Sequence, residues 1–378
     1  MKSIKLSLVQ IVVLALLATT ASAFTFDVEN TKIDIGGYVK LDLTYADPGV
    51  PGSGTVFTPG SVPRSTLDSD ANIDFSARES RYWLQTNTTT DVGTIKTYIE
   101  GDFYGDGGNE YVSNSYSLRL RHAYGSFNGW LMGQTWTTFM DLAHLGELID
   151  FTQHKSVIFV RQAQIRYTHE LSNGSLMFAV ENPENFIKTD AGASVSNSLD
   201  NNNIPDLVAR WNIKGETWQT SASALMRQFK IDDGTGNTMD EIGFAGSLTG
   251  KIIFPNKDDL RVQVNGGALG RYMGLMIYPD AIVEDNDLKV FNSYGVSGAY
   301  RHLWTPKVRS TLMLAGTFAD TNSNSTLFDS SRSVHLNLLW DVAPKVTLGV
   351  EVQRVELERG NGEDYDLNRL QFSARYGF

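Results

Sequence analysis

The sequence contains no cysteine, which excludes a disulfide framework and metal sites built on thiolates. After the N-terminal segment, no apolar run is long enough to cross a bilayer as a helix. The 43 acidic residues outnumber the 32 basic ones, and a formal net charge of −11 argues against nucleic-acid binding. Aromatic residues are plentiful, with 19 Phe, 15 Tyr and 7 Trp. No break in composition separates two domains, so the order of polar and apolar residues must indicate the fold.

The first 23 residues have the layout of a secretory signal peptide. Two lysines precede a mostly apolar stretch, which ends in the small-residue sequence Ala-Ser-Ala at 21–23. We predict cleavage between Ala23 and Phe24, which leaves residues 24–378 as one mature domain. An N-terminal transmembrane anchor is the alternative, but the apolar stretch is short for a spanning helix. Loss of the two lysines changes the formal charge from −11 to −13, because the segment contains no acid.

Polar and apolar residues alternate with a period of two along most of the chain, which predicts strands. The predicted strands number sixteen and cover residues 33–45, 76–90, 94–104, 118–127, 130–137, 161–171, 175–182, 206–214, 217–228, 239–252, 259–270, 290–303, 308–318, 331–342, 346–356 and 368–378. Short turns such as the Asn-Gly at 128–129 alternate with longer polar loops throughout. This alternation is typical of a meander whose two ends face different surroundings.

The pattern therefore predicts an all-β fold, a transmembrane up-and-down antiparallel β-barrel of about 16 strands. Closure removes the sheet edges, whose unpaired backbone groups would be costly in hydrocarbon. The short turns would lie on the periplasmic side and the long loops outside the cell. A soluble β-solenoid or a pair of sandwiches is the alternative, but neither requires alternating loop lengths.

The last predicted strand, "LNRLQFSARYGF", separates apolar and polar residues onto two faces. Leu370, Phe372, Tyr376 and Phe378 would face lipid, whereas Arg369, Gln371 and Arg375 would face water. The two final aromatic residues would lie in a periplasmic aromatic girdle. A C-terminal strand that ends in Phe also looks like the signal that the outer-membrane barrel assembly machinery recognises. We therefore expect Tyr376 and Phe378 to act as an assembly signal.

Several arginines are predicted to point into the barrel. Arg119 and Arg121 are two residues apart, so a regular strand turns both side chains to one face, opposite Leu118, Leu120 and Tyr124. Guanidinium groups stacked on one wall offer paired donors that suit carboxylates. The alternative is that inward arginines only pair with loop acids and fill space. The inward set predicted from strand parity and height is Arg81, Arg119, Arg121, Arg166, Arg210 and Arg369.

The loop at 138–160 differs from the other loops because it has an apolar face of its own, with leucines at near-helical spacing in "MDLAHLGELIDF". We expect this loop to fold into the lumen as a constriction. Its acids, Asp141, Glu147 and Asp150, would then face the arginine wall and produce a transverse field. The alternatives are an external lid or a contact between subunits.

No residues are predicted to be catalytic, to bind a metal or to hold a cofactor. The six histidines lack metal-ligand spacing, and a nucleophilic triad cannot be read from a sequence this rich in Ser and Asp. The acidic segment 231–241 lacks the spacing of a calcium loop. Barrel enzymes exist, but nothing here resembles their motifs, so we do not expect an enzyme.

Four segments resemble the DcaP-like porin family of Gram-negative outer membranes: "IDIGGYVKLDLTY", "SARESRYWLQT", "LRLRHAYGSF" with "LMGQTWTTFMD", and "VRQAQIRYT". They cover about the first half of the mature chain. The resemblance implies a homotrimer of sixteen-stranded barrels that passes small anionic solutes, with dicarboxylates as the class. This chain lacks the coiled-coil extension that one branch of the family carries before the first strand. The residues that the resemblance places at the constriction are Arg119, Arg121, Gln134, Trp136, Gln164 and Arg166.

We therefore expect a protein of the Gram-negative outer membrane that gives passive, anion-preferring diffusion of small solutes such as dicarboxylates. The alternatives are a non-selective porin and a structural or adhesive barrel with little conductance. The expected partners are small anions, the lipid bilayer with its lipopolysaccharide, the barrel assembly machinery and two further copies of the chain. Nucleic acid is not an expected partner.

Overall fold

A computed structural model describes residues 24–49, 62, 70–105, 108–109, 113–189, 191–195, 202–232, 238–322 and 325–378. The predicted signal peptide, including Ala23, lies outside these residues. In the part of the chain that the structure describes, no helix is both long and apolar enough to cross a membrane.

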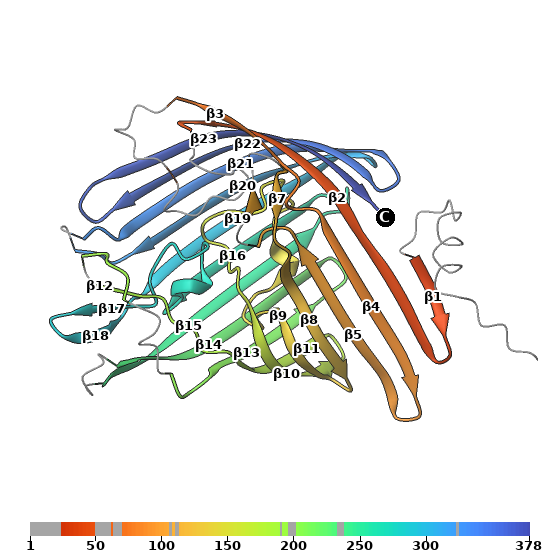
Figure 1. The fold of residues 1–378 in the computed structure, drawn as a ribbon, viewed down its shortest axis with the longest axis horizontal. Helices are drawn as coiled ribbons and strands as arrows, with labels where there is room; N and C mark the ends of the chain where they lie inside the picture. The colour runs from red at the N-terminus through yellow and green to blue at the C-terminus, as the bar shows by residue number, and fades with distance from the viewer. Residues whose placement is uncertain are drawn as a thin grey trace, which may run out of the picture.

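The described residues form one closed antiparallel sheet of sixteen strands (Figure 1). In sheet order the strands are β2 (Thr31–Asp47), β3 (Asn72–Ser76) with β4 (Arg81–Thr90), β5 (Gly93–Asp102), β8 (Arg119–Phe127), β9 (Trp130–Trp136), β10 (Arg161–Leu171), β11 (Gly174–Glu181), β13 (Asp206–Lys214), β14 (Trp218–Asp232), β15 (Thr238–Ile253), β16 (Asp259–Gly267), β19 (Ser293–Thr305), β20 (Val308–Ala319), β21 (Phe328–Ala343), β22 (Val346–Arg359) and β23 (Asp364–Gly377). β3 and β4 pair with successive parts of β2 and form one interrupted strand. β23 pairs with β2 and closes the barrel.

The predicted strands are confirmed, and β10 and β13 have the predicted bounds. The sequence pattern missed several short elements. β1 (Phe24–Val28) pairs with the first part of β2, and β23 pairs with the rest of β2. The remaining elements are β6 (Gly108–Asn109), β7 (Ser115–Tyr116), β12 (Ile187–Thr189), β17 (Ala281–Glu284), β18 (Asp287–Val290) and the 3-10 helices η2 (Leu142–His144) and η4 (Gly270–Tyr272).

Burial alternates along the strands, as a barrel between lipid and an interior requires. On β21, Leu336 and Leu338 are 48% and 44% exposed, whereas His335 and Asn337, which alternate with them, are buried. In the last strand, Phe372 and Tyr376 are exposed and Arg369 is buried. The apolar face therefore points outward and the polar face inward.

The barrel interior is crossed by two loop segments rather than one. Residues 137–160 connect β9 to β10, and Phe139, Asp150 and Ile158 in this segment are almost fully buried. Residues 268–292 connect β16 to β19, and Tyr272 and Tyr278 there have no exposed surface. The backbone N–H of Phe159 donates to the carbonyl of Tyr272 across 2.9 Å, so the two segments touch.

A β-bulge in β8 changes which residues face the interior. In the register of the two strands, Glu100 lies opposite His122 and Gly101 lies opposite Leu120, so no β5 residue lies opposite Arg121. Arg121 and His122 are both buried as a result. The prediction that Tyr124 faces outward with Leu120 is wrong, because the bulge reverses the parity and Tyr124 packs on Tyr98.

Gly133 on β9 makes room for the Tyr124 side chain. Its φ of +129° is a conformation that residues with a side chain rarely adopt. A Cβ at this position would lie 3.0 Å from the Cβ of Tyr124 and 2.3 Å from the backbone oxygen of Ala123. Glycine is therefore required where the two strands approach each other.

Candidate functional site

Arg119 and Arg121 point into the barrel from β8, but carboxylates on β5 bind both of them. Arg119 Nη2 lies 2.7 Å from Asp102 Oδ2, and Arg121 Nη1 lies 3.0 Å from the same oxygen. Arg121 Nε also donates to Glu100 Oε1 across 2.6 Å. Arg81 approaches Glu100 at 3.5 Å. Three arginines and two carboxylates leave one formal positive charge on this part of the wall.

Aromatic rings surround this arginine cluster. Trp136 packs edge-on against Phe159 at a centroid distance of 4.7 Å. The guanidinium carbon of Arg121 lies 5.9 Å from the Trp136 ring and 5.7 Å from the Phe151 ring. Arg119 lies 5.4 Å from the same Phe151 ring. At these distances the rings attract the guanidinium groups through cation–π interactions.

Two arginines on β10 form no ion pair with the carboxylates that the structure describes, and the sequence motifs indicated only one of them. The Arg161 guanidinium lies 4.3 Å above the Trp136 ring and 5.8 Å from the Phe159 ring. Arg166 shares the inward face with buried Gln162 and Gln164. Neither arginine forms an ion pair with a described carboxylate, and the Nε atom of each is buried without a hydrogen-bond partner. Strand-parity reasoning missed Arg161 because it starts β10 and its side chain reaches the lumen past Trp136.

Arg210 on β13 faces the interior without forming an ion pair in the described residues. It donates to the backbone carbonyl of Met140 and to the sulfur of Met177, the latter across 3.1 Å. Its partners therefore carry no formal charge.

The loop acids do not face Arg119 and Arg121 as predicted; of the six predicted inward arginines, Arg369 alone forms an ion pair with one of these acids among the described residues. Glu147 Oε1 accepts from Arg309 Nη2 across 2.7 Å, and Glu147 Oε2 lies 3.4 Å from Arg301 Nη1. Arg301 and Arg309 belong to β19 and β20, which are far from β8 in the sheet order. The loop crosses the interior and pairs with the opposite wall.

The other two loop acids also bind local partners. Asp150 lies 3.2 Å from Arg369 on β23 and accepts from Gln353 across 3.1 Å. Asp141 accepts from Thr249 across 2.7 Å and caps η2 through the N–H of Ala143. Each acid thus fixes a different part of the loop to the wall or to itself.

Cations of the wall also bind backbone carbonyls of the same loop. Arg261 donates to Leu145 O and Lys40 donates to Ile149 O, the latter across 3.1 Å. These contacts satisfy carbonyl groups that no regular structure pairs. The inward cations therefore include some that hold the loop, some that pair with carboxylates of the wall, and some that form no ion pair with the described residues.

The 268–292 segment has its own buried ion network, which the sequence reading missed. Arg227 on β14 is 1% exposed and binds Asp280 of the segment and Asp206 at the start of β13. Tyr272 donates to Asp206 across 2.8 Å. The signal that could have found it is the apolar content of "LGRYMGLMIYP", which is unusual for an external loop.

Neither of the two glutamines predicted at the constriction presents its side chain to the lumen of the barrel. Gln134 shares the outward face of β9 with Met132, which is 56% exposed, so its assignment to the lumen is wrong. The parity of β9 turns Thr135 inward instead, where it contacts His122. Gln164 is inward but 5% exposed, and its amide donates to Trp136 O across 2.9 Å.

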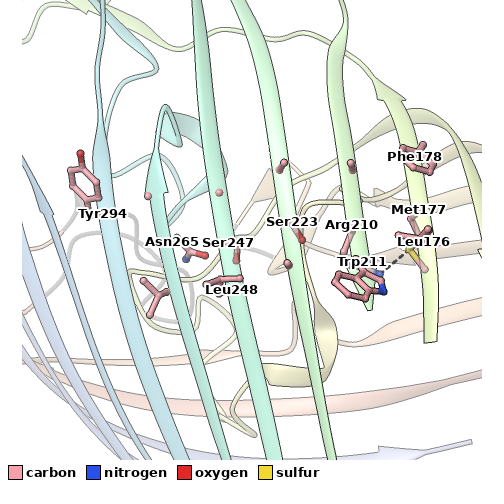
Figure 2. Close-up of a pocket in the computed structure, with 16 residues that line it drawn as sticks. Leu176, Met177, Phe178, Arg210, Trp211, Ser223, Ser247, Leu248, Asn265 and Tyr294 are labelled. Carbon is pink, nitrogen blue, oxygen red and sulfur yellow. Dashed lines mark hydrogen bonds between the residues drawn. The ribbon is translucent and has the colours of Figure 1, made fainter. Parts of the chain in front are cut away.

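A groove of about 550 Å³ lies on the outer wall of the barrel, over the strands from β11 to β19 (Figure 2). Small outward residues form its floor, including Ala224 and Gly246, and Trp211 and Tyr294 border it. The guanidinium group of Arg210 points away from the groove and donates to the sulfur of Met177, which the dashed line in Figure 2 marks. Only the rest of Arg210 lines the groove. In the described part of the chain, no group of three or more His, Cys, Asp or Glu side chains could hold a metal ion.

A sequence model of the family described as DcaP outer membrane protein matches residues 7–378. Among solved structures, the outer membrane channel DcaP of Acinetobacter baumannii superposes with a TM-score of 0.81 at 21% identity, covering 95% of this chain and 100% of that one. A search of curated proteins found no match.

Two more distant barrels share the fold. The outer-membrane expressed OmpT of Vibrio cholerae gives a TM-score of 0.60 at 14% identity and covers 94% of this chain and 100% of its own. The anion-selective porin from Comamonas acidovorans gives 0.58 at 12% identity, covering 92% and 100%. At these identities the similarity establishes the barrel architecture.

Proposed function

Because this chain belongs to the DcaP outer membrane protein family, we propose that its barrel is a diffusive porin with a preference for small anions, dicarboxylates in particular. The family and the fold make it an outer-membrane channel rather than an enzyme. Anion preference is the proposed refinement. Removal of the signal peptide at Phe24 and assembly into a homotrimer complete the proposal, and an OmpT structure in a trimer form illustrates such an assembly on this fold.

The observation that carries the proposal is the pair of inward arginines on β10 without a described carboxylate partner, Arg161 and Arg166. An uncompensated charge in a partly buried site is unfavourable unless a counter-ion approaches it. A carboxylate that meets such a fork gains two parallel hydrogen bonds. These two groups therefore attract anions, although the whole chain is acidic.

Net charge and pore charge differ because electrostatic screening depends on distance. External acids, such as those at 356–366, act on the lumen only through salt, where the Debye length is about 8–10 Å. Charges on a narrow wall are focused by the low dielectric around them. One contact worth about 1.5–3 kcal/mol enriches a solute and still allows its release.

The experiment is a planar-bilayer recording of the wild-type protein in a KCl gradient, combined with succinate and neutral-sugar uptake into liposomes. If the pore prefers anions, the zero-current potential should shift toward the chloride equilibrium potential, and succinate should enter faster than a sugar of equal size. A potential near zero would support the non-selective porin. Absence of current would support a structural or adhesive barrel. This alternative has a structural basis, because two loop segments cross the interior.

A further inference from the structure

The outward surface of β21 and β22 changes abruptly from apolar to charged toward the long loops. Val334 and Val352 are 44% and 49% exposed and belong to the lipid-facing belt. The next outward residues on the two strands are Arg332 and Arg354. The register pairs Val334 with Arg354, so the two arginines are diagonal neighbours at the upper border of the belt.

A charged cleft and two apolar grooves meet at these arginines. The cleft measures about 410 Å³ and contains both Arg332 and Arg354. One groove, of about 620 Å³, runs over β16, β19 and β20 below Arg332. The second groove, of about 440 Å³, runs over β2, β22 and β23 below Arg354. The three hollows therefore form one continuous amphipathic surface.

The two guanidinium groups have different roles in this surface. Arg354 is oriented by Glu356, to which its Nε donates across 2.8 Å, by Asn368 at 3.0 Å and by Asp366, whose Oδ2 lies 3.7 Å from its Nη2. Arg332 is exposed and forms no hydrogen bond or ion pair with the described residues. A free donor fork next to an oriented one, at the depth of lipid headgroups, matches a phosphate group.

We propose that this surface binds the phosphorylated, multiply acylated glycolipid of the outer leaflet, lipopolysaccharide. Its phosphate binds Arg332 and Arg354, and its acyl chains occupy the two grooves beneath them. The cleft also contains Glu356 and Asp366, which pair with Arg354, so the phosphate is held chiefly by Arg332. Glu358 and Asp364 line the cleft nearer the loop and repel an anion there. This site is independent of solute selectivity in the lumen.

The groove of Figure 2 provides an internal comparison on the same barrel. It is similarly apolar and about 550 Å³ in volume, but the described residues that line it include no outward-facing cation. A lipid chain that enters it has no headgroup contact to hold it. Specific retention is therefore expected at the arginine surface and not at the Figure 2 groove.

The test measures lipid bound to the purified full chain by native mass spectrometry. The probes are rough-type lipopolysaccharide, the same lipid after dephosphorylation, and phosphatidylglycerol. The variants are Arg332→Ala with Arg354→Ala, and Gly298→Leu, which fills the larger groove without a backbone clash because its nearest atom to a new Cβ is 3.8 Å away. The matched controls are Lys289→Ala, which removes an exposed cation of an external loop, and Gly246→Leu, which fills the Figure 2 groove with the same 3.8 Å clearance.

We expect the wild type to retain the phosphorylated glycolipid at least about tenfold better than the dephosphorylated form or phosphatidylglycerol. The arginine double variant and Gly298→Leu lower this retention, whereas both controls keep it, with heat-modifiable mobility showing a folded barrel in every case. Equal retention by wild type and arginine variant overturns the proposal. So does equal retention of the two glycolipid forms, or an effect of Gly246→Leu as large as that of Gly298→Leu.

Discussion

Arg121 Nε donates a hydrogen bond to Glu100 Oε1 across 2.6 Å, and the two side chains are buried together on the interior wall. The pair carries no net charge, so it contributes little to ion selectivity. Replacement of both residues, Glu100→Gln with Arg121→Met, should leave the zero-current potential unchanged. The single variant Arg121→Met leaves the buried Glu100 with only the more distant Arg81 at 3.5 Å and should destabilise the barrel by about 3–5 kcal/mol. The temperature of the heat-modifiable transition measures the second effect, and a potential that moves in the double variant would contradict the first.

The ion pair between Glu147 and Arg309 holds the 137–160 segment across the interior. Glu147→Gln removes a charge-assisted contact worth about 1.5–3 kcal/mol, so the segment should visit displaced positions more often. Single-channel recordings should then show more current fluctuations than the wild type. Glu284→Gln, which removes an exposed ion pair with Lys289, is the control and should leave the recordings unchanged. Equally quiet traces for Glu147→Gln would show that the backbone contacts alone fix the segment.

Acid should release the same contact only at low pH. Burial raises the pKa of the Glu147 carboxyl, but the hydrogen bond and charge of Arg309 outweigh this effect and hold the pKa below its ordinary value. A depressed pKa means that the stabilisation is present above the ordinary value of about 4.3 and is lost as the pH falls through the lower folded value. Current fluctuations should stay constant from pH 8 to 5 and rise below about pH 4. A rise between pH 7 and 5 would implicate another group.

Arg227 connects the 268–292 segment to the wall through Asp280 and Asp206. Arg227→Met leaves the buried Asp280 without its cation and Asp206 with only Arg271 at 3.3 Å, which costs about 3–5 kcal/mol. The heat-modifiable transition should fall markedly. A triple variant with Asp206→Asn and Asp280→Asn should recover part of the loss, because the unpaired charges are removed as well. No recovery would mean that packing of the Arg227 stem, and not charge, stabilises the segment.

Strand positions could be predicted from the sequence because lipid on one side and polar groups on the other impose a period of two on every strand. The interior arrangement could not be read in this way. The bulge at Arg121 reverses the parity on which the placement of Tyr124 depended. The partners of Glu147 and Asp150 lie on β20 and β23, and no local pattern indicates which wall a loop will reach. Whether Tyr376 and Phe378 guide assembly stays a prediction, although both are exposed on the lipid side as expected.

If Arg161 and Arg166, which form no ion pair with described carboxylates, set the preference for anions, then the double variant Arg161→Gln with Arg166→Gln must have a different zero-current potential. The two substitutions remove two positive charges without leaving a carboxylate unpaired in the described residues. In a KCl gradient the potential of this variant should move toward the cation side and succinate uptake should fall several-fold, while neutral-sugar uptake stays unchanged. The neutral exchange at Glu100 and Arg121 is the matched control. A potential that stays at the wild-type value in the Arg161 and Arg166 double variant would show that these arginines do not set the ion selectivity of the barrel.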